Sequence, residues 1–488
     1  MVPATTCIPR DFSIGPKFDF LRYVFVSDVL LHLSCPVGIS AMLYIVILSL
    51  FGAAFGFPAD FEEAIPVAEP EPGVNWAVLI AGSTGWGNYR HQADVCHAYQ
   101  ILHRNGIPDE RIVVMMADDL AHNIRNPTKG MIINHPDGKD VYHGVPKDYT
   151  RFDVTAKNFL RVLKGDREGV AGIGSGKVIQ SGPHDNVFVY YTDHGAPGIV
   201  AMPHGGMLHA DDLVTTLKEM HQENRFSKLV FYLESCESGS MFDKLLPDNI
   251  NIFATTAANG KESSYACYMD KKRKTYLGDL YSVNWMEDTD VESVQKETLQ
   301  QQFEKVKMLT NRSHVQEYGD MNLKNDIIGQ YQGTTNYPST PLPAYRQVPH
   351  DAVPSPDVPL AILNLRLETA ESEEERQTVL AELKEEINLR TSIAQTMRDI
   401  VTMVTDDADM AEDILVNHHR DITARTCYKA AVNYFHDKCY DLSQCDRCHG
   451  QRLLKDGDNE KDICSLLNFI VKVSRFCPNS LADEQARL

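Results

Sequence analysis

Two uninterrupted apolar runs, each followed by a residue capable of nucleophilic or acid-base chemistry, constrain this chain most. The first strand-like run, residues 187–192, is apolar up to Tyr191 and is followed by His194 and Gly195; the second, residues 229–234, is apolar up to Leu233 and is followed by Cys236. A continuous apolar run bounded by turn signals predicts a buried parallel strand. Ligands of an open α/β sheet bind beyond the carboxyl ends of its strands. The two runs therefore predict that the histidine and the cysteine share one edge of a sheet.

A thiol and an imidazole at one sheet edge form a candidate cysteine–histidine dyad. A neutral imidazole can take the thiol proton, and the resulting thiolate attacks a carbonyl carbon. The backbone N–H groups of Gly195 and Cys236 would then donate hydrogen bonds to the developing oxyanion. On these residues alone a second interpretation stays open. A buried structural cysteine can lie beside an unrelated loop histidine, because cysteine is often buried whatever its chemistry.

The composition is that of a globular protein with room for two domains. Of 488 residues, 43% are hydrophobic and 23% are charged, which suffices for one large core and a smaller one. The formal net charge is -20, and no basic stripe is present to neutralise phosphates. We therefore expect no nucleic-acid partner.

The eleven cysteines are unevenly spread, and six of them lie in the final 62 residues. The tail is therefore predicted to be disulfide-stapled, whereas the middle of the chain, with Cys96, Cys236 and Cys267, is not. This pattern fits a secretory-pathway protein, as does the N-glycosylation acceptor Asn311. The run at 445–449 also matches a haem-attachment or zinc pattern, but an oxidising compartment favours disulfides. We expect no metal and no cofactor.

The N-terminal part carries a targeting signal. Residues 41–57 form an uncharged apolar run that ends in small residues, as a signal peptide does. Residues 1–57 are assigned to this signal-peptide region, and 1–41 are interpreted as an upstream extension, since a methionine stands at the start of the run. An uncleaved signal anchor is the alternative, because about 20 residues without charge can span a membrane. Residues 58–74 are acidic and proline-bearing and are interpreted as a pro-segment.

Strand-like runs alternate with helical spacing over residues 75–320. The runs at 76–81, 111–116 and 250–256 join the two strands described above, and residues 94–103 have helical spacing. Recurring strand–helix–strand order predicts a mostly parallel sheet flanked by helices. The fold class is therefore α/β.

A proline-rich stretch separates this domain from a second one. Residues 321–359 are assigned to an activation segment and linker, because 338–359 carry seven prolines and no apolar period. Residues 360–488 form a C-terminal domain, in which apolar residues spaced among glutamate and arginine predict amphipathic helices.

Several short motifs of the main domain together resemble the asparaginyl endopeptidase (legumain) family of caspase-like cysteine peptidases. They are the runs at residues 76–82, 88–94, 144–149, 262–267 and 282–285, with the two strand ends above. The resemblance covers residues 75 to about 359 and implies a caspase-like α/β fold with a C-terminal all-α prodomain. It implies that Cys236 is the nucleophile, His194 the general base and acid, and Asn88 the support of the histidine. An amide oxygen suits that role because it fixes an imidazole tautomer without adding a charge.

The same resemblance implies a substrate pocket for the residue before the scissile bond, the S1 pocket. Its members would be Arg90, His91, Glu234, Ser263, Ser264 and Asp279. An asparagine side chain offers an acceptor and an N–H2 donor, so it needs a guanidinium beside carboxylates. A substrate aspartate would be repelled by the carboxylates and is expected to be cleaved only in acid. A structural ion pair at the sheet edge is the alternative interpretation of these charges.

The resemblance also implies that residues 360–488 cap the active site at neutral pH and are released in acid by self-cleavage. Asp320, Asn322 and Asn325 are candidate autoprocessing sites, and a permanent helical partner domain is the alternative. The implied partners are peptide and protein substrates, the chain's own prodomain and cystatin-type inhibitors, with no stable membrane anchor. The implied location is the secretory pathway, leading to a lysosome-like or vacuole-like acidic compartment or to secretion into a gut lumen.

Two other functions stay open at this point. The first is a transpeptidase or ligase of the same family, in which an amine captures the acyl-enzyme; the family's lipid-anchor transamidase would need a C-terminal membrane span instead of a cysteine-rich tail. The second is a binding protein on an inactive peptidase scaffold. Two departures from the family stand out: Ser235 replaces the usual alanine before the nucleophile, and the cysteine spacing over 439–477 differs.

Overall fold

The computed structural model of the chain describes residues 73–204, 206–334, 341–345, 351–405, 407–409, 412, 415, 422 and 425–438. The predicted signal-peptide region, most of the predicted pro-segment and the tail from residue 439 lie outside these ranges, so what was predicted for them stays a prediction. Among the described residues, no helix is both long and apolar enough to cross a membrane.

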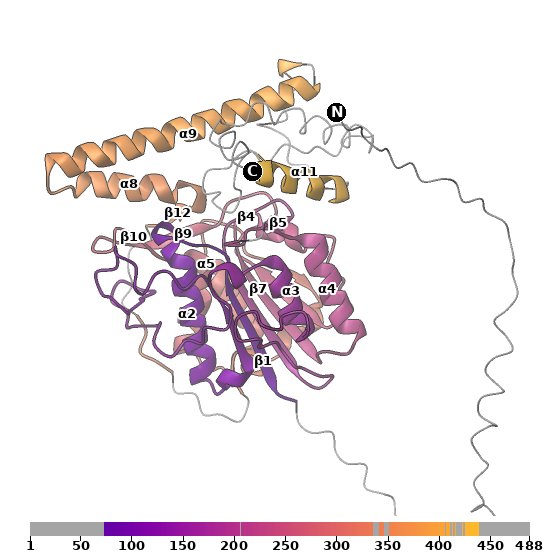
Figure 1. Ribbon diagram of the computed structural model, residues 1–488. Coiled ribbons are helices and arrows are strands. Elements are labelled where there is room, and N and C mark those ends of the chain that lie inside the picture. The colour runs from indigo at the N-terminus through magenta and orange to yellow at the C-terminus, as the bar shows by residue number, and fades with distance from the viewer. Residues whose placement is uncertain are drawn as a thin grey trace, which may run out of the picture. The chain divides into compact units, whose positions relative to one another are not determined.

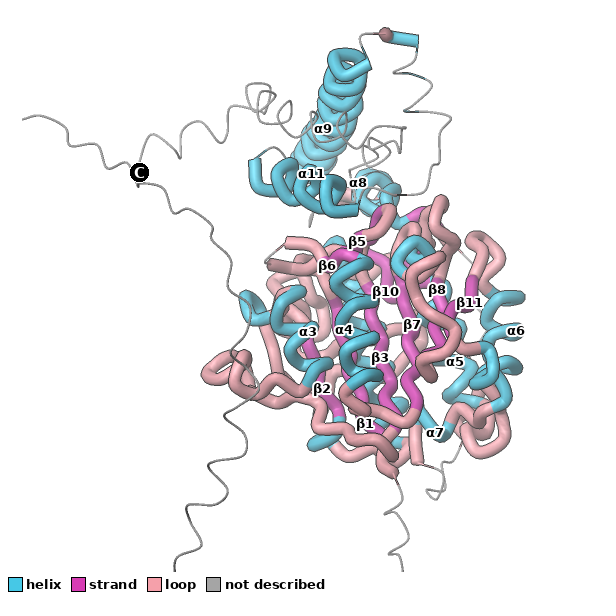
Figure 2. The backbone as a smooth tube through the Cα atoms, turned by 90° about the vertical axis from the view of Figure 1, so that its right-hand side faces the viewer, coloured by secondary structure: helices cyan, strands magenta, loops and turns pink. Residues whose placement is uncertain are grey.

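Within the described residues the central sheet has six strands, five of which run parallel. Their spatial order is β11 (Gln316–Gly319), β8 (Ile252–Thr256), β7 (Lys228–Glu234), β3 (Asn186–Thr192), β1 (Asn75–Ala81) and β2 (Ile112–Met115). β11, at one edge, is antiparallel to β8. The continuous apolar runs of the sequence form the buried strands, and the predicted α/β class with a mostly parallel sheet is confirmed (Figure 2).

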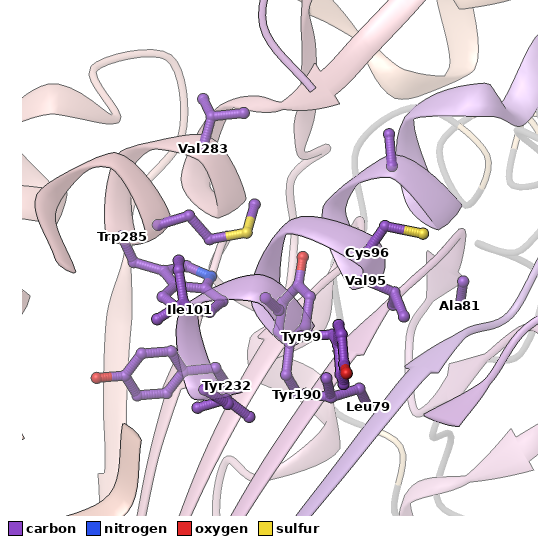
Figure 3. Close-up of a cluster of buried hydrophobic side chains, with 14 of the residues drawn as sticks. Leu79, Ala81, Val95, Cys96, Tyr99, Ile101, Tyr190, Tyr232, Val283 and Trp285 are labelled. Atoms are coloured by element: carbon purple, nitrogen blue, oxygen red, sulfur yellow. The ribbon is translucent and has the colours of Figure 1, made fainter. Parts of the chain in front are cut away.

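Helices cover both faces of this sheet, because alternate residues of a strand point to opposite faces. The helices of this domain are α2 (Tyr89–Arg104), α3 (Ala156–Lys164), α4 (Ala210–Gln222), α5 (Leu280–Val291), α6 (Leu299–Leu309) and α7 (Gly329–Gln332). Leu79 and Tyr190 belong to the core with α2 and α5, whereas Val78 and Val189 belong to the core with α3 and α4 (Figure 1). Side chains of the first core are drawn in Figure 3. Each large buried side chain contributes about 1.5–3 kcal/mol.

Two small antiparallel sheets come from shorter segments. One contains β4 (Gly195–Ala196), β5 (Ile199–Val200) and β6 (Leu208–His209), and the other contains β10 (Thr275–Asp279), β9 (Tyr265–Asp270) and β12 (Val353–Pro354). The short 3-10 helices are η1 (Trp86–Asn88), η2 (Asp109–Arg111), η3 (Arg151–Asp153), η4 (Ser238–Met241), η5 (Met321–Asn325) and η6 (Ser355–Asp357). β4 follows β3 almost directly and β10 runs straight into α5, so both small sheets begin or end at residues of the predicted site.

The α/β domain continues past the boundary predicted at residue 320. Gln332 is fully buried, and its carbonyl oxygen accepts a hydrogen bond from Asn105 Nδ2 at 3.1 Å. The carbonyl oxygen of Gly333 accepts from Asn75 Nδ2 at 2.5 Å. These contacts tie the segment to β1 and to the end of α2. The predicted boundary therefore falls inside the domain. The sequence does not indicate this extension, because a polar segment that is held by hydrogen bonds shows no apolar period.

Helices follow the linker, as the apolar spacing predicts: α8 (Val358–Glu368), α9 (Glu373–Thr405) and α11 (Arg425–Lys438). The end of the predicted linker differs from expectation, since β12, η6 and the start of α8 all lie before residue 360. Proline suits these positions because the first turn of a helix and an edge strand do not need its missing N–H. The tyrosine hydroxyl of Tyr428 on α11 donates to the Pro197 carbonyl oxygen at 2.6 Å.

Candidate active site

His194 and Cys236 come from neighbouring parallel strands at the same level. Thr192 at the end of β3 is paired in register with Glu234 at the end of β7, and each candidate catalytic residue lies two positions further on. Each is 5% exposed. The backbone N–H of Asp193 donates to the Glu234 carbonyl oxygen at 3.0 Å, which extends the strand pairing by one residue. The structure thus places the histidine and the cysteine at the sheet edge that the sequence predicts.

Gly195 leaves the space in which these two segments approach. A Cβ atom at this position would lie 2.8 Å from the Ser235 Cβ and would collide with the carbonyl oxygen of Cys236. Both partners belong to the segment that follows β7, so a side chain here would push the strand ends apart. This close approach is the physical reason why a glycine stands beside the histidine.

The thiol of Cys236 is buried and needs a base to ionise. Burial raises the pKa of Cys236 to about 12, with the neighbouring Glu237 carboxylate adding to the effect. Hydrogen bonds oppose this rise: the Ser264 backbone N–H lies 3.3 Å from Sγ and its hydroxyl lies 3.8 Å away. A thiol with so high a pKa is protonated at neutral pH, so nucleophilic attack requires a base at the moment of reaction.

Asn88 fixes the orientation of His194. Its Oδ1 lies 3.0 Å from the histidine Nε2, and its Nδ2 donates to the Thr84 carbonyl oxygen at 3.1 Å. Because Nδ2 is the donor to Thr84, Oδ1 must accept, and Nε2 must carry the histidine proton. The other ring nitrogen, Nδ1, is then the acceptor available to a thiol.

Arg90 and Asp279 form a buried ion pair. The Nε of Arg90 donates to Oδ1 of Asp279 at 2.8 Å, and the two side chains are 0% and 1% exposed. Arg90 also donates from Nη1 to the Gly87 carbonyl oxygen at 3.3 Å and to Asn88 Oδ1 at 3.4 Å. Asp279 precedes α5 at the end of β10, so the pair joins the beginning of α2 to the second small sheet.

Glu234 completes a cluster of carboxyl groups around this pair. Its Oε2 accepts from the backbone N–H and the hydroxyl of Ser282, at 3.1 and 3.0 Å. Burial, followed by the charge of Asp279, raises the pKa of Glu234 well above its ordinary value. Burial also raises the pKa of Asp279, although Arg90 opposes this. The arrangement therefore favours protonated carboxyl groups to a higher pH than usual.

His91 connects the ion pair to the candidate dyad. Its Nε2 lies 3.5 Å from Asp279 Oδ2 and its Nδ1 lies 3.5 Å from Asp193 Oδ1, while Nδ1 is also 2.6 Å from the Ser83 hydroxyl. The ring stands edge-on to His194, with centroids 4.9 Å apart. Burial, then Arg90 and His194, lower the pKa of His91 well below its ordinary value. His91 is therefore a neutral ring that packs between charges.

The ligand atoms of His91, Asp193 and His194 lie within 4.8 Å of one another. Distance alone would therefore allow a cation. A histidine that accepts the thiol proton cannot keep its lone pair on a metal at the same time. In the predicted dyad, His194 uses this lone pair for the thiol proton.

The structure brings together all six predicted S1 residues and the predicted catalytic residues. Ser264 contacts Cys236 through its backbone N–H, and the half-buried Ser263 before it is also a hydrogen-bonding neighbour of Cys236. Sequence reasoning missed Ser282, which holds Glu234, and Ser355. Arg90 Nη2 donates to the Ser355 hydroxyl at 3.5 Å. The one available signal was the Ser-Pro sequence inside a proline-rich stretch, which does not indicate a position beside the site.

Ser355 directly follows the short strand β12 and begins η6. β12 pairs antiparallel with β9, with Val353 opposite Ala266, and the Ser355 backbone N–H donates to the Ser264 carbonyl oxygen at 2.9 Å. An added strand beside an exposed edge is also how extended peptides bind to proteins. A segment of the chain's own linker thus lies where β9 would otherwise offer an edge.

The three candidate autoprocessing residues belong to a folded segment. Asp320 is 6% exposed, its side chain accepts from the Asn322 N–H at 3.0 Å, and its own N–H donates to the Ile252 carbonyl oxygen at 2.7 Å. Asn322 and Asn325 are exposed on η5. Cutting here requires local unfolding, so these sites stay predictions. Asn311, the predicted glycosylation site, is exposed just after α6.

The three cysteines predicted to lie outside disulfides are free thiols and buried: Cys96, Cys236 and Cys267. The thiol of Cys96 lies 3.9 Å from the Met116 sulfur in the core of α2. It is therefore a packing residue, whereas Cys236 lies at the sheet edge beside His194.

Known proteins match this chain over most of its length. Residues 75–334 match the model of the Peptidase C13 family. Legumain from Homo sapiens is 51% identical over 378 residues, which are 77% of this chain and 87% of that protein. The vacuolar-processing enzyme beta-isozyme of Arabidopsis thaliana is 43% identical over 405 residues, covering 78% and 83%. Among solved structures, caspase-1 from Spodoptera frugiperda matches 51% of this chain and 86% of its own at 8% identity, with a TM-score of 0.30.

Proposed function

Because this chain belongs to the Peptidase C13 family of cysteine peptidases, we propose that it is an endopeptidase that cleaves peptide bonds after asparagine. The observation that carries the proposal is the buried ion pair of Arg90 with Asp279, whose charge acts on Glu234, two residues before Cys236. A donor beside carboxylates matches the amide of an asparagine side chain.

Cleavage proceeds through an acyl-enzyme. The thiol of Cys236 passes its proton to Nδ1 of His194, and the thiolate attacks the scissile carbonyl carbon. The oxyanion is stabilised by the N–H groups of Gly195 and Cys236. His194 then protonates the leaving nitrogen as the C–N bond breaks, which leaves a thioester. Water attacks the thioester, gives a proton to the histidine, and releases the carboxylic acid with the thiol restored.

Selection of asparagine follows from the charges of the cluster. Arg90 would donate to the side-chain carbonyl oxygen, and Glu234 and Asp279 would accept from the N–H2 group. An aspartate in the same place adds a negative charge beside two carboxyl groups whose pKa values are raised by burial. Protonation of the cluster removes that repulsion. Cleavage after aspartate is thus restricted to acid.

The chain is made as a zymogen in which its own C-terminal part covers the site. Two observations support this: Ser355 and β12 lie against Arg90 and β9, and α11 contacts the loop after His194 through Tyr428 and Pro197. Acid weakens contacts that depend on carboxylates, since a protonated carboxyl loses its attraction to a cation. The helical region is then cut free by the enzyme itself.

The acidic trigger places the enzyme in an acidic compartment of the secretory pathway. One relative is named a vacuolar-processing enzyme, and the predicted signal peptide, N-glycosylation at Asn311 and disulfides agree with this route. Peptides and proteins are the substrates, and cystatin-type inhibitors are proposed as further partners.

A single titration tests the proposed function. The purified proform and a Cys236→Ala variant are taken from pH 7 to pH 4, and mass and cleavage are followed with matched peptides that carry Asn, Asp, Lys or Ala before the scissile bond. We expect acid-triggered loss of mass with Asn-selective cleavage, absent in the variant. Equal cleavage of the Lys or Ala peptides would overturn the specificity. Products joined to an added amine would point to a transpeptidase instead.

A further inference from the structure

A continuous run of buried polar contacts leads away from the S1 cluster into the domain. Asp94 on α2 accepts from the backbone N–H of Asp279 at 3.3 Å, and the Asn134 amide donates to Asp94 Oδ1 at 2.7 Å. The other end of that amide, Oδ1, lies 2.8 Å from Nδ1 of His97. His97 Nε2 lies 3.0 Å from Asp290 on α5. None of these five side chains belongs to a residue more than 4% exposed.

The polarity of this run is fixed by its two ends. Asn134 Nδ2 faces two acceptors, Asp94 Oδ1 and the Leu277 carbonyl oxygen at 2.7 and 2.8 Å, so it is the N–H2 group and Oδ1 accepts. His97 must therefore donate from Nδ1. Its Nε2 faces the Asp290 carboxylate and donates as well. A ring that donates from both nitrogens is an imidazolium.

The electrostatics agree with that assignment. Burial lowers the pKa of His97, but Asp290, Asn134 and Glu287 together outweigh burial, and the pKa lies above its ordinary value. Burial raises the pKa of Asp290, but His97 and Arg104 together hold it below its ordinary value. Arg104 contributes a second ion pair to Asp290 at 2.7 Å. At the outer end of the run, His97 is thus held in its positively charged form and Asp290 in its negatively charged form.

The inner end of the run is a pair of carboxyl groups that compete for protons. Burial, then Asp279, raise the pKa of Asp94 well above its ordinary value, and the Asn134 hydrogen bond opposes the rise. The titratable groups facing the pair are Arg90, His91, Glu234, Tyr190, Cys267 and His194. Those facing His97 are Asp290, Glu287, Arg104 and Tyr345. Arg90 is the cation in direct contact with Asp279.

Gly278 makes the central contact of the run possible. A Cβ at this position of β10 would lie 3.0 Å from Asn134 Nδ2, 3.2 Å from Asp94 Oδ1 and 2.5 Å from Val283 Cγ1. The amide and the carboxylate therefore meet directly over a backbone that carries no side chain. A side chain at position 278 would occupy the space in which Asn134 and Asp94 form their hydrogen bond.

We propose that Asn134 and His97 are positioning residues that set the charge of the Asp94–Asp279 pair, and through it the choice between asparagine and aspartate before the scissile bond. The inference rests on the proposed asparagine specificity. His97 donates to Asn134 Oδ1 and, together with the Leu277 carbonyl oxygen on the other side of the amide, keeps the N–H2 group directed at Asp94. The amide N–H2 stabilises the ionised form of Asp94, and this negative charge next to Asp279 helps to exclude an aspartate substrate.

Removal of the Asn134 amide should let aspartate in at higher pH. In Asn134→Leu, Asp94 loses its donor and takes up a proton more readily. The pH below which aspartate is cleaved should rise by about one unit, the shift expected for one lost charge-assisted hydrogen bond. His97→Gln should shift the profile in the same direction by a smaller amount, because the amide of Asn134 can then turn. The double variant should match Asn134→Leu alone, since His97 acts only through Asn134.

The experiment measures kcat/KM for matched Asn and Asp peptides from pH 4 to pH 7 on acid-activated enzyme, with active sites titrated. Asn126→Leu is the matched control: this buried asparagine donates to the carbonyl oxygens of Leu120, Ala121 and Met131 and touches no member of the run. Its stability should fall while its Asp-to-Asn profile stays that of the wild type.

Each outcome decides one question. An unchanged profile in active Asn134→Leu, or an equal shift in Asn126→Leu, overturns the inference. If Asn134→Leu does not fold, His97→Gln takes its place, and an unchanged profile there has the same meaning. A shift in the double variant equal to the sum of the single shifts would show that His97 acts independently. Failure of the proposed function is seen separately, in a wild type that shows no preference for the Asn peptide.

Discussion

The Nε atom of Arg90 donates to Oδ1 of Asp279 across 2.8 Å in a place where neither side chain is more than 1% exposed. One guanidinium thus stands among three buried carboxyl groups, because Asp94 and Glu234 also face Asp279. A single cation cannot compensate three carboxylates in a buried site. Some of these carboxyl groups therefore stay protonated above their ordinary pKa, and the charge of the cluster depends on pH.

The first prediction concerns substrate choice. The ratio of kcat/KM for cleavage after aspartate to that after asparagine should rise as the pH falls from 6 to 4, because protonation lowers the negative charge that an aspartate side chain meets. The measurement uses two peptides that differ only in this residue. A ratio that is constant between pH 4 and 6 would contradict the proposed role of Glu234 and Asp279.

The strand ends that carry the dyad could be predicted because their signal is local. The apolar runs before His194 and Cys236 are continuous, and parallel strands bring their carboxyl ends to one edge whatever the loops between them do. Gly195 could be predicted for the same reason, although the collision that requires it is visible only in the structure.

Contacts between distant segments could not be predicted from the residues alone. Arg90 and Asp279 are 189 positions apart, and they meet because α2 packs against β10. The position of Ser355 depends on β12 pairing with β9, and two short strands give no apolar period. The run through Asn134 depends on polar side chains from three elements, and buried polar contacts leave no periodic pattern in a sequence. The family resemblance supplied the S1 residues, but not the residues that hold them in place, such as Ser282 and Ser355.

The second prediction tests the role of Asn88. Asn88→Ala removes the acceptor for His194 Nε2–H and should lower kcat about tenfold, since one hydrogen bond of about 1–1.5 kcal/mol is lost from the ring that must receive the thiol proton. KM for the Asn peptide should change much less. Thr84→Ala is the control, because its contact with Asn88 uses only the backbone carbonyl oxygen. A large rise in KM with kcat unchanged would contradict a role in positioning the histidine.

The third prediction concerns release of α11. His209 Nε2 lies 3.1 Å from Asn433 Oδ1, and Lys429 forms an ion pair with Asp212 at 2.6 Å. Burial lowers the pKa of His209 in this contact. His209 therefore binds a proton less well when α11 is docked than when it is released. Docking is stable at neutral pH and weakens as the pH falls toward the ordinary pKa of histidine and below it.

His209→Gln keeps a hydrogen-bonding side chain without this titration, so release of the C-terminal helices should begin at lower pH than in the wild type. The measurement follows release by limited proteolysis with an added protease, in the Cys236→Ala background. Lys429→Ala should act in the opposite direction and release α11 at higher pH. The same release pH in all three proteins would mean that the contacts of α11 do not control it.

A second carboxyl pair lies between α5 and α6. Burial, then Asp288, raise the pKa of Glu297 from 4.5 to about 8, and Lys305 pairs with Asp288 and, at 2.9 Å, with Glu292. In the unfolded chain Glu297 loses its proton near the ordinary value, whereas the folded protein keeps it to about 8. Between these two pH values the folded state binds more protons than the unfolded state.

The fourth prediction follows from this sign. The free energy of unfolding should fall as the pH rises from about 5 to about 8 and should level off above that range, because the folded state then binds no excess proton at this site. Glu297→Gln, in the Cys236→Ala background, should flatten the dependence of Tm on pH over the same range. Glu304→Gln is the matched control, since Glu304 is exposed on α6 and accepts only from Gln300 in the same helix at 2.9 Å. Thermal unfolding at a series of pH values measures both variants. A slope that is equally steep in Glu297→Gln and in the control would show that this carboxyl pair does not link stability to pH.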